Sequence, residues 1–206
     1  MSCAAKSMST RSYHDRMSTR DRILDAAEQA LREHGIVGAT TKRIARQAGC
    51  SEALLYKHFP GKEALLLAVL LERQPTLGQA LTRLRQGAGQ GDLADALTGF
   101  AVAAVEFYTR AAGIASGVLA DPSLMAGFRN MLAESGRGPH VPVLALAEII
   151  KAEQGGGRID ADMDAQAAAA MLMGACFHRA NLSHFVDLPE DTRTWAATVV
   201  GTLLRR

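Results

Sequence analysis

The sequence predicts an all-α fold. Apolar residues recur at intervals of three and four along most of the chain, and no stretch alternates apolar and polar residues for long enough to indicate a strand. Glycine and proline interrupt this pattern where helices are expected to end. With 206 residues, 48% of them hydrophobic, the chain has enough apolar surface to bury a substantial core.

Cysteine usage and hydropathy indicate in which cellular compartment the protein is expected. Cys3, Cys50 and Cys176 are widely separated and show no metal-ligand spacing, which favours a reducing environment. The longest strictly apolar runs, residues 64–71 and 167–177, are much shorter than the roughly 20 residues that cross a bilayer. No signal peptide is recognisable. We therefore expect a cytoplasmic protein that makes no membrane contact.

The charge is unevenly distributed. Residues 1–75 hold 12 Lys and Arg against 8 Asp and Glu, a net of +4, whereas residues 76–206 hold 11 against 13, a net of −2. A basic module joined to a neutral or acidic domain is typical of proteins that bind nucleic acid through one domain.

The first segments are an arm and a helix. Residues 1–17 contain almost no large apolar side chains, so we expect a flexible N-terminal arm, either solvated or reaching a DNA minor groove with Arg11 and Arg16. A helix is expected from Ser18 or Thr19 to Gly35, with Asp21 placed as in a capping box.

Residues 40–63 predict a helix-turn-helix. Thr40 or Thr41 caps a short helix whose inward side carries Ile44, Ala45 and Ala48. Gly49 gives the backbone freedom for a tight turn, and Ser51 caps a second helix that turns Leu55 inward. The second helix is the candidate DNA reader.

The run from Leu55 to Leu65, together with Thr41 to Ala48, resembles the DNA-binding domain of the tetracycline-repressor (TetR) family of bacterial transcription regulators. The resemblance extends upstream to Thr19 and covers roughly residues 18 to 70. It implies a three-helix DNA-binding domain over residues 18–63 and a helical ligand-binding and dimerisation domain over residues 64–206.

The resemblance also implies roles for side chains in and near the second helix. Ala53, Leu54 and Lys57 are expected to face base edges, while Tyr56 and Lys62 grip phosphates. Because Leu54 stands where many relatives have Thr or Ser, only apolar contact is expected there. Lys62 also opposes the dipole of the helix that it begins, which suits a site that receives an anion. The complete set of candidate DNA-binding residues is Thr41, Lys42, Glu52, Ala53, Leu54, Tyr56, Lys57, His58 and Lys62.

The remaining chain predicts six helices. The first follows Pro60 and Gly61 and runs towards Gln86, and the glycine-rich residues 87–91 are interpreted as a helix connection because no strand precedes them and no Gly-Lys-Ser/Thr follows. The others are expected at residues 93–112, from Asp121 to the break at 136–139, at 140–153, at 162–186 and at 189–204.

Aromatic and methionine side chains in the larger domain are either ordinary core or the lining of a ligand cavity. The resemblance favours the cavity, because TetR-like regulators generally release DNA when a small molecule enters this domain. The candidates are Phe100, Phe107, Tyr108, Met125, Phe128, Met131, Met171 and Phe177.

No catalytic or metal-binding arrangement is apparent. His178 and His184 are spaced poorly for a shared metal, and no Ser-His-Asp, paired-carboxylate or Cys-His pattern occurs. We therefore expect no catalytic residues, no metal and no cofactor, and a non-enzymatic protein.

The resulting prediction is a ligand-responsive repressor that leaves a palindromic double-stranded DNA operator when an unknown small-molecule inducer binds. We expect a homodimer built from the last two helices, because small residues between 165 and 175 and the stripe around Trp195 suit a bundle between subunits. Two alternatives stay open: a small-molecule-binding protein or enzyme with a vestigial helix-turn-helix, and an architectural protein that binds DNA with little sequence preference.

Overall fold

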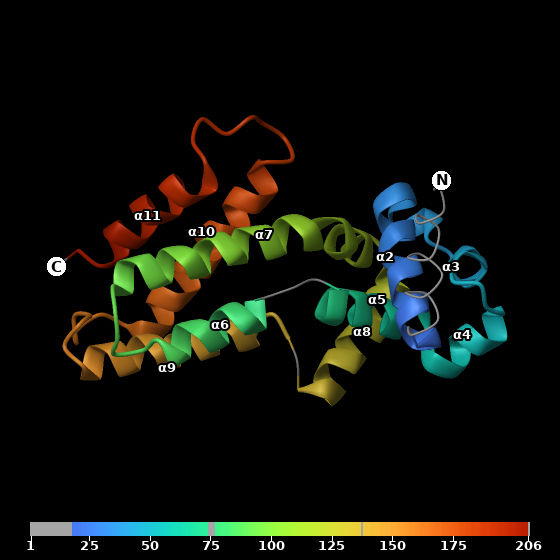
Figure 1. The fold of residues 1–206 in the computed structure, drawn as a ribbon, viewed down its shortest axis with the longest axis horizontal. Helices are drawn as coiled ribbons and strands as arrows, with labels where there is room; N and C mark the ends of the chain where they lie inside the picture. The colour runs from blue at the N-terminus through green and yellow to red at the C-terminus, as the bar shows by residue number, and fades with distance from the viewer. Residues whose placement is uncertain (1–17, 74–76, 137, 206) are drawn as a thin grey trace, which may run out of the picture. The chain divides into compact units, whose positions relative to one another are not determined.

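A computed structural model describes residues 18–73, 77–136 and 138–205 (Figure 1). All regular secondary structure in these ranges is helical, with no strand, so the predicted all-α class is confirmed. The predicted N-terminal arm, residues 1–17, lies outside the described residues.

The chain folds as two compact units. Of the described residues, unit 1 takes 18–73 and 113–128, and unit 2 takes 77–112, 129–136 and 138–205. Two helices contribute to both units, α7 (Leu93–Ala120) and α8 (Pro122–Ser135). Unit 1 therefore contains the predicted DNA-binding domain and a segment from the middle of the chain.

Unit 1 begins with four helices: α2 (Thr19–Gly38), α3 (Thr41–Gln47), α4 (Glu52–His58) and α5 (Lys62–Ala68). Ser18 caps α2 by accepting a hydrogen bond from the Asp21 amide at 3.1 Å, as the sequence predicts. The backbone of Gly35 is left-handed, with φ of 62°, and interrupts the helix at the predicted end. The core of unit 1 includes the fully or almost fully buried side chains of Ile23, Leu24, Ile44, Leu55, Leu65, Leu66 and Val69.

The predicted single helix from Gly61 to Gln86 is not uniformly α-helical. After α5 the chain forms a π-helical turn, η1 (Val69–Arg73), and α6 (Leu77–Gln86) begins beyond residues 74–76, which are not described. Arg20 holds η1 against α2 through two hydrogen bonds of 2.6 Å to the Glu72 carboxylate, and its guanidinium lies 5.1 Å from the centre of the Phe59 ring. A local change from α to π hydrogen bonding leaves the apolar periodicity almost unaltered, so the sequence pattern carried no signal of it.

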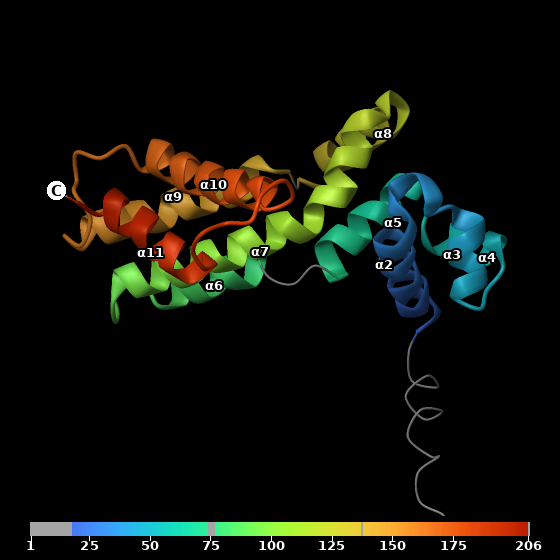
Figure 2. The same ribbon diagram turned by 90° about the horizontal axis from the view of Figure 1, so that it is seen from above.

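Unit 2 is a helical bundle of α6, residues 93–112 of α7, and three further helices: α9 (His140–Gly155), α10 (Ala165–Leu182) and α11 (Thr192–Leu203). Within it, α9 packs against α6 and α10, and α10 packs against α11, as Figures 1 and 2 show. Its core includes Leu97, Phe100, Leu146, Ile150, Leu172, Cys176 and Val200.

Helices α7, α10 and α11 have boundaries that differ from the predicted ones. Helix α7 runs eight residues beyond Ala112, because Ile114 and Val118 are buried in the core of unit 1 and stabilise a segment that contains two glycines. Helix α10 begins at Ala165 because Asp164 caps it, and it ends at Leu182 rather than Val186. Helix α11 likewise begins at Thr192, after Asp191, which accepts bonds from two amides of the first turn.

Within the described residues, none of the helices taken singly has the length and apolar content to cross a membrane. Helices α7 and α8 pass that test only as a pair bent by 115°.

A buried ion pair fastens two loops of unit 2. Glu153 is 2% exposed and accepts hydrogen bonds from Arg158 Nε at 2.6 Å, Arg158 Nη2 at 2.9 Å and the Gly89 amide at 3.0 Å. Arg158 also donates from Nη1 to the Gly91 carbonyl at 2.9 Å. The hydrogen bonds from Arg158 hold the pKa of Glu153 below its ordinary value, although burial acts in the opposite direction.

We expect Glu153→Gln to lower the free energy of unfolding by about 1.5 to 3 kcal/mol at neutral pH, because it removes the charge from these bonds. The pKa of Glu153 is depressed from 4.5, so the difference from wild type should be full above pH 4.5 and shrink as pH falls through the lower folded value. Urea unfolding at several pH values measures it. Glu148→Gln is the matched control, since Glu148 pairs with Lys151 at the exposed surface of the same helix. An equal fall in stability in both variants would contradict the structural role of Glu153.

Candidate nucleic-acid interface

Helices α3 and α4 of unit 1 form the predicted helix-turn-helix. Thr40 Oγ1 accepts from the Arg43 amide at 3.3 Å and Ser51 Oγ accepts from the Leu54 amide at 3.1 Å, so each helix has a side-chain cap. Between them, Gly49 has φ of 66°, a conformation that side chains rarely adopt, and the Cys50 amide donates to the Ala45 carbonyl at 2.9 Å. The turn is therefore fixed by both residue choice and hydrogen bonding.

Burial determines which side of α4 faces outward. Leu55 and Phe59 are 0% and 2% exposed and pack into the core of unit 1. On the opposite side Ala53, Tyr56 and Lys57 are exposed, while Glu52, Leu54 and His58 are half-buried. The outward side consequently presents the candidate residues that the sequence assigned to DNA.

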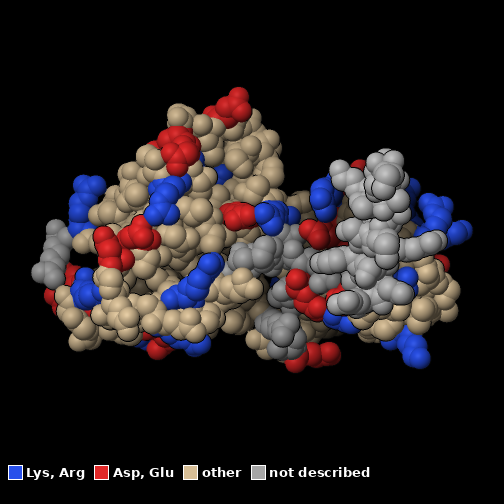
Figure 3. Space-filling view, in the orientation of Figure 1, with Lys and Arg blue, Asp and Glu red and all other residues tan. Residues whose placement is uncertain are grey.

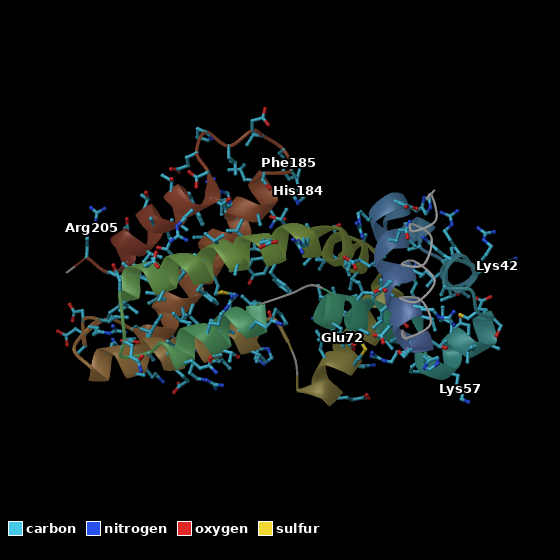
Figure 4. All side chains as sticks on the ribbon, viewed as in Figure 1. Lys42, Lys57, Glu72, His184, Phe185 and Arg205 are labelled. Atoms are coloured by element: carbon cyan, nitrogen blue, oxygen red, sulfur yellow. The ribbon has the colours of Figure 1, made fainter. Side chains whose placement is uncertain are left out.

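Helix α3 adds basic side chains to the outward surface. Lys42 is exposed near its start, and Figure 4 shows Lys42 and Lys57 extending away from the ribbon of α3 and α4. Arg46, also exposed, was absent from the predicted set, although it lies four residues after Lys42 and therefore on the same face of the helix. Figure 3 shows Lys and Arg side chains around this part of unit 1.

Arg22 is a second basic residue that the sequence pattern did not reveal. Its Nη1 lies 3.9 Å from the position that a Cβ on Gly49 would occupy, so its guanidinium lies beside the turn. It donates to Thr19 Oγ1 at 3.4 Å and forms no salt bridge within the described part of the chain. Helix spacing could not predict this contact, because Arg22 and Gly49 lie on different elements.

Thr41 links the two helices. Its Oγ1 donates to Glu52 Oε1 at 2.5 Å and lies 3.3 Å from the Tyr56 hydroxyl. Since the one hydroxyl proton of Thr41 goes to the carboxylate, Tyr56 is the donor in the second contact. Three of the candidate residues thus form one hydrogen-bonded group at the start of α3 and on the outward side of α4.

Lys62 is positioned by a main-chain contact. Its Nζ donates to the Ile36 carbonyl at 2.7 Å, and the side chain is half-buried. Burial lowers the pKa of Lys62, while the carboxylates of Asp121 and Glu63 oppose that shift. An ammonium has three donors, so two remain for other acceptors. The predicted phosphate contact of Lys62 stays a prediction.

The candidate cavity residues fall into different environments. Phe100, Phe107 and Tyr108 pack with the core of unit 2, whereas Met125 and Phe128 pack with the core of unit 1. Met131 is half-buried. The ring of Tyr108 contacts Phe107 and Phe177 edge-on, at centroid distances of 5.4 and 5.3 Å.

Two of the candidate cavity residues are mainly at the surface of unit 2. Met171 is 69% exposed and Phe177 is 52% exposed, both on α10. Two hollows among the described residues lie elsewhere, one around Gly78 and Arg83 and the other around Ile159 and Leu204. The ligand cavity therefore stays a prediction as well.

The comparisons with known proteins agree on the family. Residues 23–69 match the family model described as bacterial regulatory proteins, tetR family. The HTH-type transcriptional regulator UidR of Escherichia coli (strain K12) is 41% identical over 68 residues, a match that covers 33% of this chain and 33% of UidR. The match thus spans about a third of the length of such curated relatives.

Likeness to solved structures covers more of the chain. Salmonella enterica GusR is 28% identical with a TM-score of 0.67, covering 90% of this chain and 95% of GusR. FadR from Bacillus subtilis, solved in complex with stearoyl-CoA, is 19% identical with a TM-score of 0.61, covering 89% of this chain and 97% of FadR, and shows the shared fold alone. Residues 23–69 therefore match the DNA-binding part of the tetR family of bacterial regulatory proteins, and the chain shares its fold with solved regulators such as GusR.

Proposed function

We propose that this chain is a DNA-binding transcriptional regulator, a repressor that leaves a palindromic operator when a small molecule binds. The observation that carries the proposal is the outward side of α4, where Ala53, Tyr56 and Lys57 are exposed above a buried Leu55 and Phe59. A helix with an exposed side of this kind fits the major groove, and the capped N-terminus of α3 is available to contact the phosphate backbone. This role needs no catalysis and no cofactor, and it is carried out in the cytoplasm, where the operator is.

The assembly proposed is a homodimer through α10 and α11. One reader helix contacts too few bases for strong specificity, and a two-fold dimer presents two. The support is an apolar and small-residue surface on α10, where Ala167, Ala170, Met171, Gly174 and Phe177 are all exposed in the single chain. Ala197 and Thr198 of α11 are exposed too, and Gly201 is half-buried. Burying such faces against a second copy removes apolar area from water.

The proposed response is a population shift. The dimer has one form whose two reader helices fit adjacent major grooves and another form in which they do not. An inducer that binds the second form more tightly shifts the population towards it, and DNA affinity falls by the ratio of the inducer's affinities for the two forms. FadR, a solved regulator of the same fold, binds stearoyl-CoA, and the aromatic group of Phe107, Tyr108 and Phe177 offers apolar contacts for an inducer of this chain.

Competition by random DNA tests the proposal. Duplexes selected from a random pool are bound in the presence of excess random duplex of equal length, and a regulator keeps its selected site. Equal competition by random duplex would instead indicate an architectural protein, and no binding to any duplex would indicate a ligand carrier or enzyme with a vestigial helix-turn-helix.

Leu54→Ala and Lys57→Ala should each narrow the gap in affinity between the selected site and random duplex, by roughly 1 to 3 kcal/mol for each base contact that the substitution removes. Only Lys57→Ala removes a charge, so only it should alter the salt dependence. Fluorescence anisotropy with both duplexes measures the gap. Arg32→Ala, on the solvent side of α2, is the control. If the difference in affinity between the selected site and random duplex is unchanged in both variants, the side chains of α4 do not contact base edges.

Lys62→Ala should weaken binding to both kinds of duplex and make the slope of log K against log salt less steep by about one unit per subunit, because one fewer counterion is released. Binding titrations at four or more salt concentrations give the slope. An unchanged slope would leave Lys62 with a structural role only, that of holding the Ile36 carbonyl.

Gly174→Glu should yield monomers. A Cβ on Gly174 meets nothing within 4 Å in the single chain, so the fold accepts a side chain there, whereas a charged side chain inside a subunit interface is costly. Light scattering at micromolar concentration measures the mass. Gly99→Glu on α7, where a Cβ likewise meets nothing within 4 Å, is the control and should remain dimeric. A dimeric Gly174→Glu protein would count against an interface on this face of α10.

A further inference from the structure

The Glu52 carboxylate is a negative charge on a surface proposed to meet DNA. It lies in the first turn of α4, one residue before the exposed Ala53, and it is half-buried. Thr41 Oγ1 donates to its Oε1 at 2.5 Å, and Tyr56 in turn donates to Thr41 at 3.3 Å. The carboxylate is therefore held in place from α3 and does not swing freely in solvent.

The charges around Glu52 on α3 and α4 are otherwise basic. Lys42, Arg46 and Lys57 are exposed on these two helices, yet within the part of the chain that the structure describes no cation forms a salt bridge with Glu52. A hydroxyl group is its hydrogen-bond partner. Its charge is thus not neutralised by a neighbouring side chain and acts on whatever approaches the outward side of α4.

A carboxylate interacts with DNA in two opposite ways. It repels every phosphate, and this repulsion is present whichever sequence lies in the groove. It also accepts a hydrogen bond from the exocyclic amino group of cytosine, which projects into the major groove. Adenine also projects an amino group there, but its N7 acceptor lies beside that group and repels a carboxylate. Duplexes that place a cytosine amino group opposite the carboxylate therefore offset the repulsion best.

We infer that Glu52, held by Thr41, is a specificity determinant that penalises binding to DNA lacking a cytosine amino group opposite it. The inference rests on the proposed function, since it concerns the same reading surface. It assigns to Glu52 a role that differs from the phosphate and base attraction of its neighbours: the residue lowers affinity for the wrong sequences. Specificity is a difference between affinities, so a repulsive element raises it without any stronger contact to the correct site.

Glu52→Gln isolates the charge. The amide oxygen of glutamine still accepts from Thr41 and still accepts from a cytosine amino group, while the repulsion disappears. One unit charge about 6 Å from a phosphate in water changes affinity on the order of threefold. With two reader helices in a dimer, we expect affinity for random duplex to rise about tenfold and affinity for the selected site to change much less.

The experiment compares four proteins on the duplex selected by the wild type and on a random duplex of equal length. Glu52→Asp keeps the charge and should not raise random binding. Glu28→Gln, which removes the charge of a half-buried residue on α2 that pairs with Arg32, should not raise it either. A second selection with Glu52→Gln should show a weaker preference for cytosine at the one position in each half-site where the wild type shows it, because the acceptor remains and only the charge is lost.

Three results would overturn the inference. Random binding that is unchanged in Glu52→Gln would show that the charge imposes no penalty. An equal rise in Glu52→Asp would assign the effect to the altered geometry of the Thr41 bond, and an equal rise in Glu28→Gln would assign it to net charge. Failure of the proposed function is a separate outcome, because then the wild type itself shows no preference between the two duplexes.

Discussion

The reading surface depends on how closely α3 and α4 pack. Ala45 and Ala48 leave room for the second helix, Leu55 fills the space between the pair and α2, and Gly49 turns the chain with positive φ. Because Leu55 is wholly buried, the rotation of α4 about its own axis is fixed, and the side chains of Ala53, Tyr56 and Lys57 face outward. A larger residue at either alanine would separate the helices and misplace the outward side chains together.

The hydrogen bonds of this surface divide its polar residues into two kinds. Thr41, Glu52 and Tyr56 bond to one another, and Lys62 bonds to the main chain, so these groups are oriented before any ligand arrives. Lys42, Arg46 and Lys57 extend into solvent. Oriented groups suit geometric recognition, while solvent-exposed basic side chains suit attraction to phosphates at longer range.

The sequence predicted those parts of the fold that local chemistry determines. Ser18, Thr40 and Ser51 cap the helices expected of them, and Gly35 and Gly49 take positive φ at the expected helix end and the expected tight turn. What it missed depends on contacts between distant residues: the extension of α7 into unit 1 through Ile114 and Val118, the π turn beside Arg20, and the buried pair of Glu153 and Arg158. For the site, residue spacing found the outward side of α4, but it could not show that Thr41 and Lys62 have protein partners.

The most direct test of the central claim is a structure of this chain bound to its selected duplex. We expect α4 in the major groove, with Ala53, Leu54 and Lys57 at base edges and the Tyr56 hydroxyl turned from Thr41 to donate to a phosphate. A second α4 should lie one helical turn, roughly 34 Å, away along the DNA. A complex in which α4 lies outside the groove, or in which one subunit binds alone with its outward side in solvent, would contradict it.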